Sequence, residues 1–482
     1  MRSLITAAVA SLLQGCFAAN AADWRSRSIY QVFTDRFART DGSTTAPCDV
    51  TNNIYCGGSW KGLENNLDYI KNMGFTAVEQ VTDAYHGYYQ TDLYSLNNRF
   101  GFAYDLKSLA SALHSRGMYL MVDVVPNHMA FPGCPDTVDY GRFKVFNKAD
   151  HFHSYCPLNN MANQTEVEHC WLGDCKMAMP DIKTENTEVA SEMNTWIKEL
   201  VSNYSIDGLR IDSVKNVNKA FFPPFCESAG VFCMGEVSEG EANYTYPYQE
   251  YMDSVLDYPL YYAITRVFQQ QSNMSDLVVG LAACTKNGAT GCKDSTLLGT
   301  FFENHDNPRF PHTTNDLSLV KNALAFTVLG DGIPILYQGQ EQHYAGGDDP
   351  GCREALWLSE FNTTSPLYAH TALLNNLRNH IIAHSTTYLG YQTRVLSYTA
   401  TEIQLRKDAI RTVLSNQGEK SPSWTLTTQG MEFEQGKTVV DVLSCAKYDV
   451  TYEGEVHVQM NAGRPVVLVV EGALGGSALC GY

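Results

Sequence analysis

The sequence predicts an α/β fold: a (β/α)8 TIM barrel with a loop-rich subdomain inserted after strand 3 and a C-terminal antiparallel β-sandwich. Up to residue 385, short apolar runs alternate with helical patterns, as expected for parallel strands joined by helices. Residues 128–182 interrupt this alternation with a stretch rich in Cys, His, Asn and Gly, and an insert of this length is usually a functional subdomain. Across residues 386–482, short runs separated by turn residues indicate the β-sandwich.

Residues 1–21 have the pattern of a signal peptide. Arg2 supplies a positive charge, Leu4–Leu13 is largely apolar, and Ala19-Asn20-Ala21 has the form of a cleavage site. No later run reaches the length of a membrane span. We therefore expect a secreted, extracellular protein that has no membrane partner.

Composition narrows the possible partners. The 482 residues suffice for a large barrel with one or two smaller units. The formal net charge of −18 argues against binding to nucleic acid or an anionic membrane. It is compatible with an exported protein that acts on a neutral polymer.

The first part of the barrel, residues 22–127, contains three expected strands. They are separated by helical spacing, in which Leu63, Leu67, Ile70 and Met73 recur before Gly74. The expected strands are Ser28–Phe33, Phe75–Val81 and Tyr119–Val125.

The second part of the barrel, residues 183–385, resumes the alternation after the insertion. A helix is expected over 188–203, followed by a buried strand over Gly208–Ile211. Further apolar runs follow at Val231–Glu236, Leu297–Asp306 and Ile333–Tyr337, and a helix is expected over 318–329. Beyond the barrel, the clearest strand of the sandwich is Val466–Val470.

Glu79 is an unexpected charge inside the second strand. A buried charge is costly unless it is paired. Three explanations remain open: a divergence that opens one side of the cleft, a paired Glu79, or a sequence with a missing piece. The loop between this strand and Tyr88 is also short.

Three expected strands end in carboxylates, at Asp212, Glu236 and Asp306. The carboxyl ends of barrel strands meet at one face, so these side chains are expected to converge. Arg210 lies two residues before Asp212 and faces the same side of its strand, where it favours the ionised carboxylate. A structural ion pair would have the same pattern. Two carboxyl groups suffice for glycoside hydrolysis.

Four segments make the sequence recognisable: GLRIDSVKN, GEV, ENHDNPR and DVVPNHM. They resemble the signature segments of the α-amylase family of glycoside hydrolases. Further segments, including ADWRSRSIY and GQEQHYAGG, are similar to those of secreted fungal α-amylases of the Taka-amylase type. The resemblance implies endo-acting, retaining hydrolysis of α-1,4-glucosidic bonds in starch or maltooligosaccharides, by a monomer. Two alternatives remain: an α-glucanotransferase on the same scaffold, and a catalytically impaired relative.

The resemblance also assigns roles to residues. Asp212 would be the nucleophile, Glu236 the general acid/base, and Asp306 would stabilise the transition state. Burial is expected to raise the pKa of Glu236, which has no basic neighbour in sequence. The implied substrate-binding residues are Arg210, His128, His305, His86, Tyr88, Lys215, Asp349 and Arg353.

A calcium ion is implied between the insertion and the barrel. Asn127 and Asp181 would supply side-chain oxygens, and Glu168 and Asn216 backbone carbonyls, which suits the hard oxygen ligands that Ca²⁺ prefers. Asn216 stands where relatives have a histidine, but a backbone ligand tolerates that change.

The cysteines suggest disulfides with an odd thiol left over, since thirteen of the fourteen lie beyond the leader. The resemblance implies the pairs Cys48–Cys56, Cys156–Cys170 and Cys445–Cys480. Tyr246 stands where a further cysteine is expected, so Cys292 could pair with Cys284 instead. Sequons for glycosylation begin at Asn163, Asn203, Asn243, Asn273 and Asn362.

Overall fold

The computed structural model of the chain describes residues 19–80, 85–285, 290–428 and 430–482. An eight-stranded parallel sheet forms its centre, in the order β10-β11-β1-β2-β3-β7-β8-β9. Leu256, just after β9, forms a parallel bridge with Gly299 of β10, so the two ends of this order meet and close the barrel. The strands are β1 (Ile29–Val32), β2 (Ala77–Gln80), β3 (Tyr119–Val124), β7 (Gly208–Ile211), β8 (Phe232–Gly235), β9 (Ser254–Val255), β10 (Gly299–Thr300) and β11 (Ile333–Tyr337).

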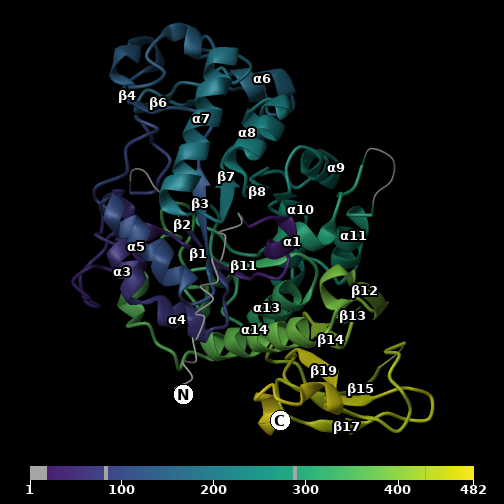
Figure 1. Cartoon of the computed structure of the whole chain (residues 1–482). Helices are drawn as coiled ribbons and strands as arrows, with labels where there is room; N and C mark the ends of the chain where they lie inside the picture. The colour runs from purple at the N-terminus through teal and green to yellow at the C-terminus, as the bar shows by residue number, and fades with distance from the viewer. Residues whose placement is uncertain (1–18, 81–84, 286–289, 429) are drawn as a thin grey trace, which may run out of the picture.

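Helices surround these strands, as the ribbon in Figure 1 shows. Most bury one apolar face against the barrel and expose the other. The helices are α1 (Ala21–Trp24), α2 (Thr34–Phe37), α3 (Trp60–Asn65), α4 (Leu67–Asn72), α5 (Ala103–His114), α7 (Thr187–Tyr204), α8 (Phe222–Ala229), α9 (Ala242–Thr245), α10 (Tyr258–Phe268), α11 (Ser275–Ala283), α12 (Phe310–Thr313), α13 (Leu317–Leu329) and α14 (Pro366–His384).

The helix predicted over residues 63–73 is two helices, α3 and α4, that meet at Asn66. The backbone of Asn66 is not helical, with φ −115° and ψ 15°. Its side-chain amide donates to the Gly62 carbonyl at 2.9 Å, and such side-chain to backbone bonds compete with the regular helix. The apolar spacing was therefore a correct guide to burial but not to helix continuity.

The N-terminal described residues pack under the barrel. Trp24 is fully buried and stacks on Phe232, with ring centroids 5.3 Å apart. Asn20 caps α1, and the Ala19 carbonyl accepts a hydrogen bond from the Phe232 amide at 3.1 Å. Cleavage after Ala21, as the signal-peptide pattern suggests, would remove the Asn20 cap and the Ala19 hydrogen bond but keep Trp24. Residues 1–18 of that prediction lie outside the described residues.

The insertion after β3 lies at the end of the molecule opposite the C-terminal domain (Figure 1). It contains helix α6 (Gln164–His169) and a small sheet in the order β4-β6-β5. Disulfides Cys134–Cys175 and Cys156–Cys170 bind its loops together. The strands of this small sheet are β4 (Phe131–Pro132), β5 (Leu172–Gly173) and β6 (Met177–Met179).

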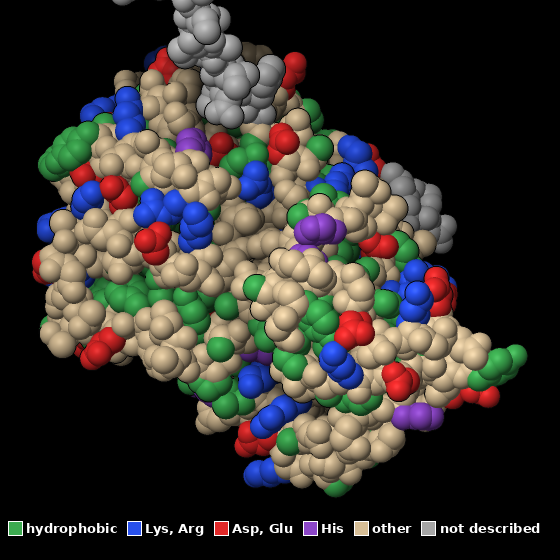
Figure 2. Space-filling view, turned by 60° about the horizontal axis from the view of Figure 1, so that its bottom comes forward, with side chains coloured by type: hydrophobic (Ala, Val, Ile, Leu, Met, Phe, Trp, Pro, Cys, Tyr) green, Lys and Arg blue, Asp and Glu red, His purple; other side chains and the backbone are tan. Residues whose placement is uncertain are grey.

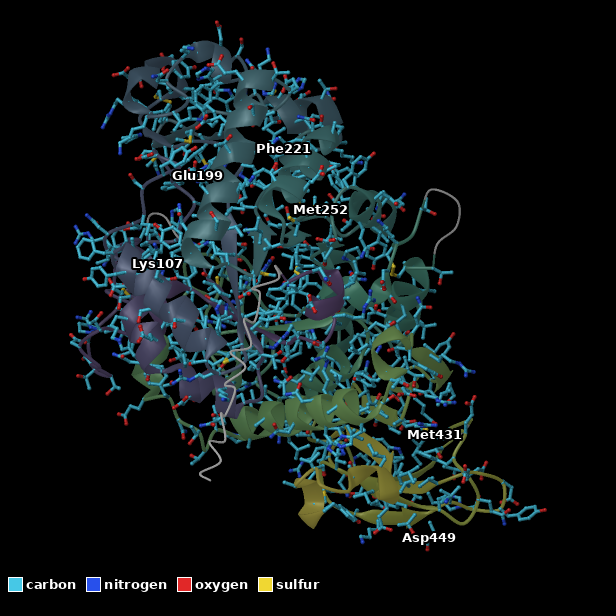
Figure 3. All side chains as sticks on the ribbon, in the orientation of Figure 1. Lys107, Glu199, Phe221, Met252, Met431 and Asp449 are labelled. Atoms are coloured by element: carbon cyan, nitrogen blue, oxygen red, sulfur yellow. A yellow bond between two sulfur atoms is a disulfide. The ribbon has the colours of Figure 1, made fainter. Side chains whose placement is uncertain are left out.

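The C-terminal domain consists of a six-stranded and a two-stranded antiparallel sheet, as the alternating pattern predicted. The larger sheet has the order β12-β13-β14-β19-β16-β17, and β15 pairs with β18. Met431 lies in the apolar core of this domain (Figure 3). The strands are β12 (Arg394–Tyr398), β13 (Glu402–Lys407), β14 (Ile410–Ser415), β15 (Trp424–Thr427), β16 (Thr438–Asp441), β17 (Lys447–Asp449), β18 (His457–Met460) and β19 (Val466–Val470).

Disulfide pairing agrees with the expected pairs and adds one that was not foreseen. Cys48–Cys56, Cys156–Cys170 and Cys445–Cys480 are bonded, and Cys284 does pair with Cys292. The pair Cys134–Cys175 could not be predicted from sequence, because the two cysteines are 41 residues apart in a loop-rich segment. Within the described part of the chain three thiols are free, not one: Cys226, Cys233 and Cys352.

On one face of the molecule, charged side chains of both signs can be followed directly (Figure 2). On the face shown in Figure 2, basic and acidic side chains are interspersed and form no broad patch of one sign. Among the helices that the structure describes, none has the length and apolar character needed to cross a membrane.

Candidate active site

Arg210 is the centre of a buried ionic cluster at the carboxyl ends of β3, β7 and β8. Its Nη1 donates to Asp212 Oδ1 at 2.7 Å and to Asp123 Oδ2 at 2.9 Å. Its Nη2 lies 3.0 Å from Glu236 Oε1. One guanidinium therefore holds three carboxylates from three neighbouring strands, and it makes Asp212 and Glu236 neighbours.

Ser213 also connects the two carboxyl groups. Its hydroxyl donates to Asp212 Oδ2 at 2.6 Å, and its amide donates to Glu236 Oε2 at 3.1 Å. This arrangement places Ser213 in the left-handed region, with φ 52°. On the other side of Glu236, the Tyr258 hydroxyl donates to Oε1 at 3.2 Å and accepts from the Asn304 amide at 3.1 Å.

The environment sets the protonation of Glu236. Burial raises its pKa to about 7; Arg210 opposes this rise, and the charges of Asp212 and Asp306 add to it. Glu236 has no basic neighbour in sequence, but the fold brings Arg210 into contact with it. Desolvation nevertheless outweighs the guanidinium, so the direction of the predicted shift is confirmed.

The pKa of Asp306 shifts in the opposite direction from that of Glu236. Burial opposes its ionisation, but the charges of His305, Arg353 and Arg210 outweigh burial and lower its pKa. Arg353 Nη2 donates to Asp306 Oδ1 at 3.2 Å, and Arg353 Nη1 lies 2.9 Å from Asp349 Oδ1. The site thus keeps Asp306 ionised close to a carboxyl group that stays protonated up to neutral pH.

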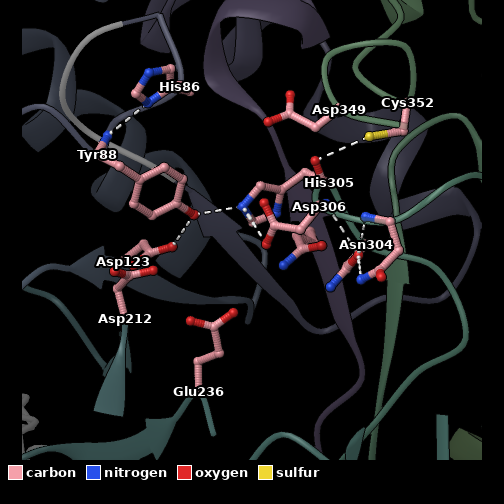
Figure 4. A network of polar contacts seen from close by, with 12 residues as sticks. His86, Tyr88, Asp123, Asp212, Glu236, Asn304, His305, Asp306, Asp349 and Cys352 are labelled. Carbon is pink, nitrogen blue, oxygen red and sulfur yellow. Dashed lines mark hydrogen bonds and ion pairs between the residues drawn. The ribbon is translucent and has the colours of Figure 1, made fainter. Parts of the chain in front are cut away.

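Tyr88 joins these groups from the other side of the site, as Figure 4 shows. Its hydroxyl donates to Asp123 Oδ2 at 2.8 Å and lies 2.6 Å from His305 Nε2. Its ring stacks on His305, with centroids 5.6 Å apart. Burial lowers the pKa of His305 to about 4. The neutral imidazole therefore donates from Nε2 to the tyrosine oxygen.

The two remaining histidines differ in what they can offer a ligand. The Tyr88 amide donates to His86 Nδ1 at 3.1 Å, and burial lowers the pKa of His86 to about 3. Its Nε2 therefore carries the hydrogen and can donate it to a sugar hydroxyl. In His128, Nε2 contacts the Tyr88 carbonyl at 3.1 Å and Nδ1 contacts the Asn127 amide at 3.2 Å, so both nitrogens are already engaged.

These side chains form the walls of an open cleft of about 570 Å³. Its size and its aromatic and polar lining suit a small-molecule or oligosaccharide ligand. It is lined by Asn53, Tyr55, Tyr85, His86, Tyr88, Tyr89, His128, Met179, Asp212, Ser213, Glu236, Asp306, Asp349 and Arg353.

Three residues expected to bind substrate do not line this cleft. Arg210 and His305 lie beneath it, each with only 1% of its surface exposed. Lys215 is turned aside, and its ammonium group donates to the Ser238 carbonyl at 2.9 Å. Arg210 and His305 thus act on the residues above them, and Lys215 is held on a neighbouring loop.

Comparisons with known proteins decide the family. The model of the α-amylase catalytic domain matches residues 31–365. The chain belongs to the α-amylase family. The model of α-amylase domain C matches residues 395–482, over the C-terminal sheets.

Several relatives of this family match nearly the whole chain. Alpha-amylase 2 of Schwanniomyces occidentalis is 46% identical and covers 96% of this chain and 93% of its own length. Alpha-amylase 1 of Lipomyces kononenkoae is 48% identical and covers 95% of this chain and 76% of its own length. The structure of an alpha-amylase from Malbranchea cinnamomea is 47% identical, with a TM-score of 0.93, and covers 96% of this chain and all of its own.

Glu79 is a departure within the barrel of this α-amylase family member. It is fully buried, and the Gln31 amide donates to its Oε1 at 2.9 Å. Among the described residues, its Oε2 has no hydrogen-bond partner. Burial raises the pKa of Glu79, although the charge of Arg210 opposes this rise. Of the three explanations, pairing therefore applies only to Oε1 of Glu79. Its partner is the Gln31 amide and not a cation. Asp83 of the short loop lies outside the described residues.

Three of the expected calcium ligands bring oxygens together between insertion and barrel. The Asn127 side-chain oxygen lies 3.2 Å from Asp181 Oδ1 and 3.0 Å from the Asn216 carbonyl, with no donor between them. All three residues are buried. Converging oxygens without a donor are what a hard cation requires, so this donor set fits Ca²⁺. The opposite amide orientation would instead let Asn127 donate to both oxygens.

Sequence reasoning missed several residues of the site. Tyr258 and Asn304 support Glu236 from α10 and from the segment after β10. Asn304 lies within the segment ENHDNPR, but no role was predicted for it from the sequence. Asp123 did carry a signal, since it is the one charge in an otherwise apolar strand. Tyr85 and Asn53 line the cleft, and the Tyr85 hydroxyl donates to Asn53 Oδ1 at 2.8 Å.

Proposed function

We propose that this protein is an endo-acting α-amylase that hydrolyses α-1,4-glucosidic bonds in starch and maltooligosaccharides with retention of configuration. The relatives at 44–48% identity carry the name alpha-amylase. The observation that carries the proposal is the position of Asp212 and Glu236 on one guanidinium, at the floor of an open cleft. Retaining glycosidases need two carboxyl groups only about 5–5.5 Å apart.

Each carboxyl group has the support that its role requires. Asp212 accepts hydrogen bonds on both oxygens and would attack the anomeric carbon as an oriented carboxylate. Glu236, whose pKa is about 7, would protonate the leaving oxygen and then take a proton from the attacking water. Asp306, ionised and exposed to the cleft, would stabilise the positive charge that develops on the sugar.

Substrate contacts would come from the cleft walls. His86 Nε2 offers a free hydrogen, and Tyr88 and Tyr89 offer ring faces and edges for stacking on sugars. Asp349 and Arg353 would bind outer sugar units. Arg210 and His305 would position other residues, and His128 would contribute its ring edge to the wall.

We also propose that Asn127, Asp181, Glu168 and Asn216 hold Ca²⁺ between the insertion (residues 128–182) and the barrel (residues 22–127 and 183–385). A bound cation would favour the ionised form of Asp181, whose pKa burial raises to about 7 in the ion-free protein. The ion would fix Asn127, whose amide then donates to His128 at the edge of the cleft.

The protein is further proposed to be a secreted monomer. Its relatives are yeast and fungal proteins, and its disulfides are compatible with an oxidising compartment. The five sequon asparagines are all exposed, so each is accessible to glycosylation: Asn163, Asn203, Asn243, Asn273 and Asn362.

A product profile tests the proposed reaction. The purified protein, in calcium-containing buffer, is incubated with maltoheptaose, and the products are separated by length and analysed by NMR for anomeric configuration. Short maltooligosaccharides with α-configured new ends are expected. Asp212→Asn should abolish them, because the amide cannot act as the nucleophile.

Other outcomes separate the alternatives. Products longer than maltoheptaose as the main species would make the protein a glucanotransferase, in which a sugar and not water accepts the glycosyl group. The absence of any reaction with wild-type protein would identify a catalytically impaired relative.

A further inference from the structure

A second cluster of metal-binding side chains lies outside the cleft, between the insertion and the segment before α7. One nitrogen of His153, one of His169 and one carboxylate oxygen of Glu185 lie within 4.8 Å of one another. We propose that these three residues form a site for a divalent transition metal ion such as Zn²⁺, separate from the proposed calcium site.

The backbone holds these residues in place although they are distant in sequence. The His153 amide donates to the Asp181 carbonyl at 3.0 Å, and its carbonyl accepts from Trp171 Nε1 at 2.9 Å. His169 ends α6 beside the Cys156–Cys170 disulfide. Its ring lies 4.4 Å from that of His153, centroid to centroid.

The ligand set selects the type of ion. Two imidazoles and one carboxylate suit Zn²⁺, Ni²⁺ or Cu²⁺, whereas Ca²⁺ prefers an all-oxygen set like that around Asn127 and Asp181. Two different kinds of ion would therefore occupy the two sites without competing for ligands.

Asp181 orients His153 in the way that supporting carboxylates orient metal-binding histidines. Its Oδ2 lies 2.6 Å from His153 Nδ1, and the other ring nitrogen, Nε2, lies 2.7 Å from Glu185 Oε1. A carboxylate on one nitrogen fixes the ring and leaves the other to the metal. The ion would take the place between Nε2 and the Glu185 carboxylate.

The site is accessible from solvent and incomplete without water. The Glu185 side chain is 43% exposed, and that of His153 is 11% exposed. Three protein ligands leave one position of a tetrahedral ion to water. Because Glu185 lies beyond the insertion, the ion would connect the insertion to the segment that leads into α7.

Zinc titration of the calcium-loaded protein by calorimetry tests the proposal. We expect one Zn²⁺ per chain that is lost, or weakened at least ~10-fold, in the double variant His169→Asn/Glu185→Gln. Co²⁺ in place of Zn²⁺ should give the visible absorption of a tetrahedral site. The single variant Glu185→Gln, at an exposed position, gives the same information if the double variant has a lower thermal midpoint.

The matched control is His380→Asn. His380 and His384 lie one turn apart on α14, with ring centroids 4.3 Å apart, and form another histidine pair outside the proposed site. This variant should keep the proposed site. Zinc binding that the His169 and Glu185 changes leave intact, or that His380→Asn abolishes, would overturn the proposal. A wild-type protein that binds no Zn²⁺ would show that the cluster is only an ion-pair network around His153.

Discussion

The surroundings of Glu236 determine the pH range in which the proposed site should be active. Burial holds its pKa near 7 although a guanidinium lies 3.0 Å away. The protonated form is the general acid, so activity should be present below this pKa and decline as the pH rises through it. We therefore expect kcat/KM for maltoheptaose to fall with a midpoint near pH 7 on the alkaline side.

The Tyr258 hydroxyl gives this expectation an internal check. It donates to Glu236 Oε1 and so favours the carboxylate. In Tyr258→Phe the pKa should rise, and the alkaline limb should move to higher pH by a few tenths of a unit. A wild-type profile that already declines at pH 4–5, as for an ordinary carboxyl group, would contradict the assignment.

Glu79 is the residue for which the sequence predicted a conflict and the structure found one. Burial raises the pKa of Glu79 above its ordinary value in the folded protein, so the unfolded chain loses this proton at a lower pH than the folded chain does. Stability should therefore decrease as the pH rises above about 4.5 and towards the folded value. Glu79→Gln keeps a group that accepts from Gln31 and has no charge to desolvate.

We expect Glu79→Gln to raise the thermal midpoint by about 1–3 °C at neutral pH, and to have no effect below pH 4. Differential scanning calorimetry across this range measures the difference. Glu199→Gln, at an exposed position on α7, is the control and should change neither midpoint. A destabilised Glu79→Gln at neutral pH would show that Glu79 is ionised and paired with Arg210.

At the scale of elements, we expect the proposed calcium ion to stabilise the insertion. Its strands β4, β5 and β6 have only two or three residues each, and Asp181 lies two residues after the end of β6. Chelation should therefore lower the thermal midpoint and expose residues 128–182 to proteases. A ligand present at a hundred times its Kd stabilises by about 2.7 kcal/mol.

Asp181→Asn is the matched variant for calcium, because the amide keeps the shape of the side chain and loses its charge. It should lower the stability gained from added calcium and leave the protein less sensitive to chelation. Wild-type protein whose midpoint and metal content do not respond to chelation would contradict the calcium proposal.

The strands and helices also show how much of the fold and of the site could be predicted from the sequence. The strands Gly208–Ile211 and Ile333–Tyr337 were predicted to the residue, because short, mainly apolar runs between turn residues have one interpretation in a parallel barrel. Asp212 followed from the end of the first of these strands, and Glu236 from the end of the apolar run Val231–Glu236. Tyr258, Asn304 and Cys134–Cys175 did not, because they reach their partners from helices and loops whose positions only the closed fold determines.

At the scale of the whole molecule, one core joins the barrel to the C-terminal sheets. The largest apolar cluster runs from α13 and α14 into β13, β14 and β19. Asn322 is fully buried in this junction. Its Oδ1 accepts a hydrogen bond from the Ser415 amide at 2.8 Å, and its Nδ2 donates to the Gly463 carbonyl at 2.8 Å. The two domains should therefore unfold together.

Asn322→Ala tests this coupling. It leaves a buried amide and a carbonyl without partners, at a cost of about 1–3 kcal/mol. One cooperative transition should move down by about 2–5 °C, with kcat at low temperature unchanged, because Asn322 does not line the cleft. Asn376→Ala, at an exposed position on α14, should leave the transition in place. Two separate transitions in the wild-type protein would show that the C-terminal domain unfolds on its own, since a continuous core cannot melt in independent parts.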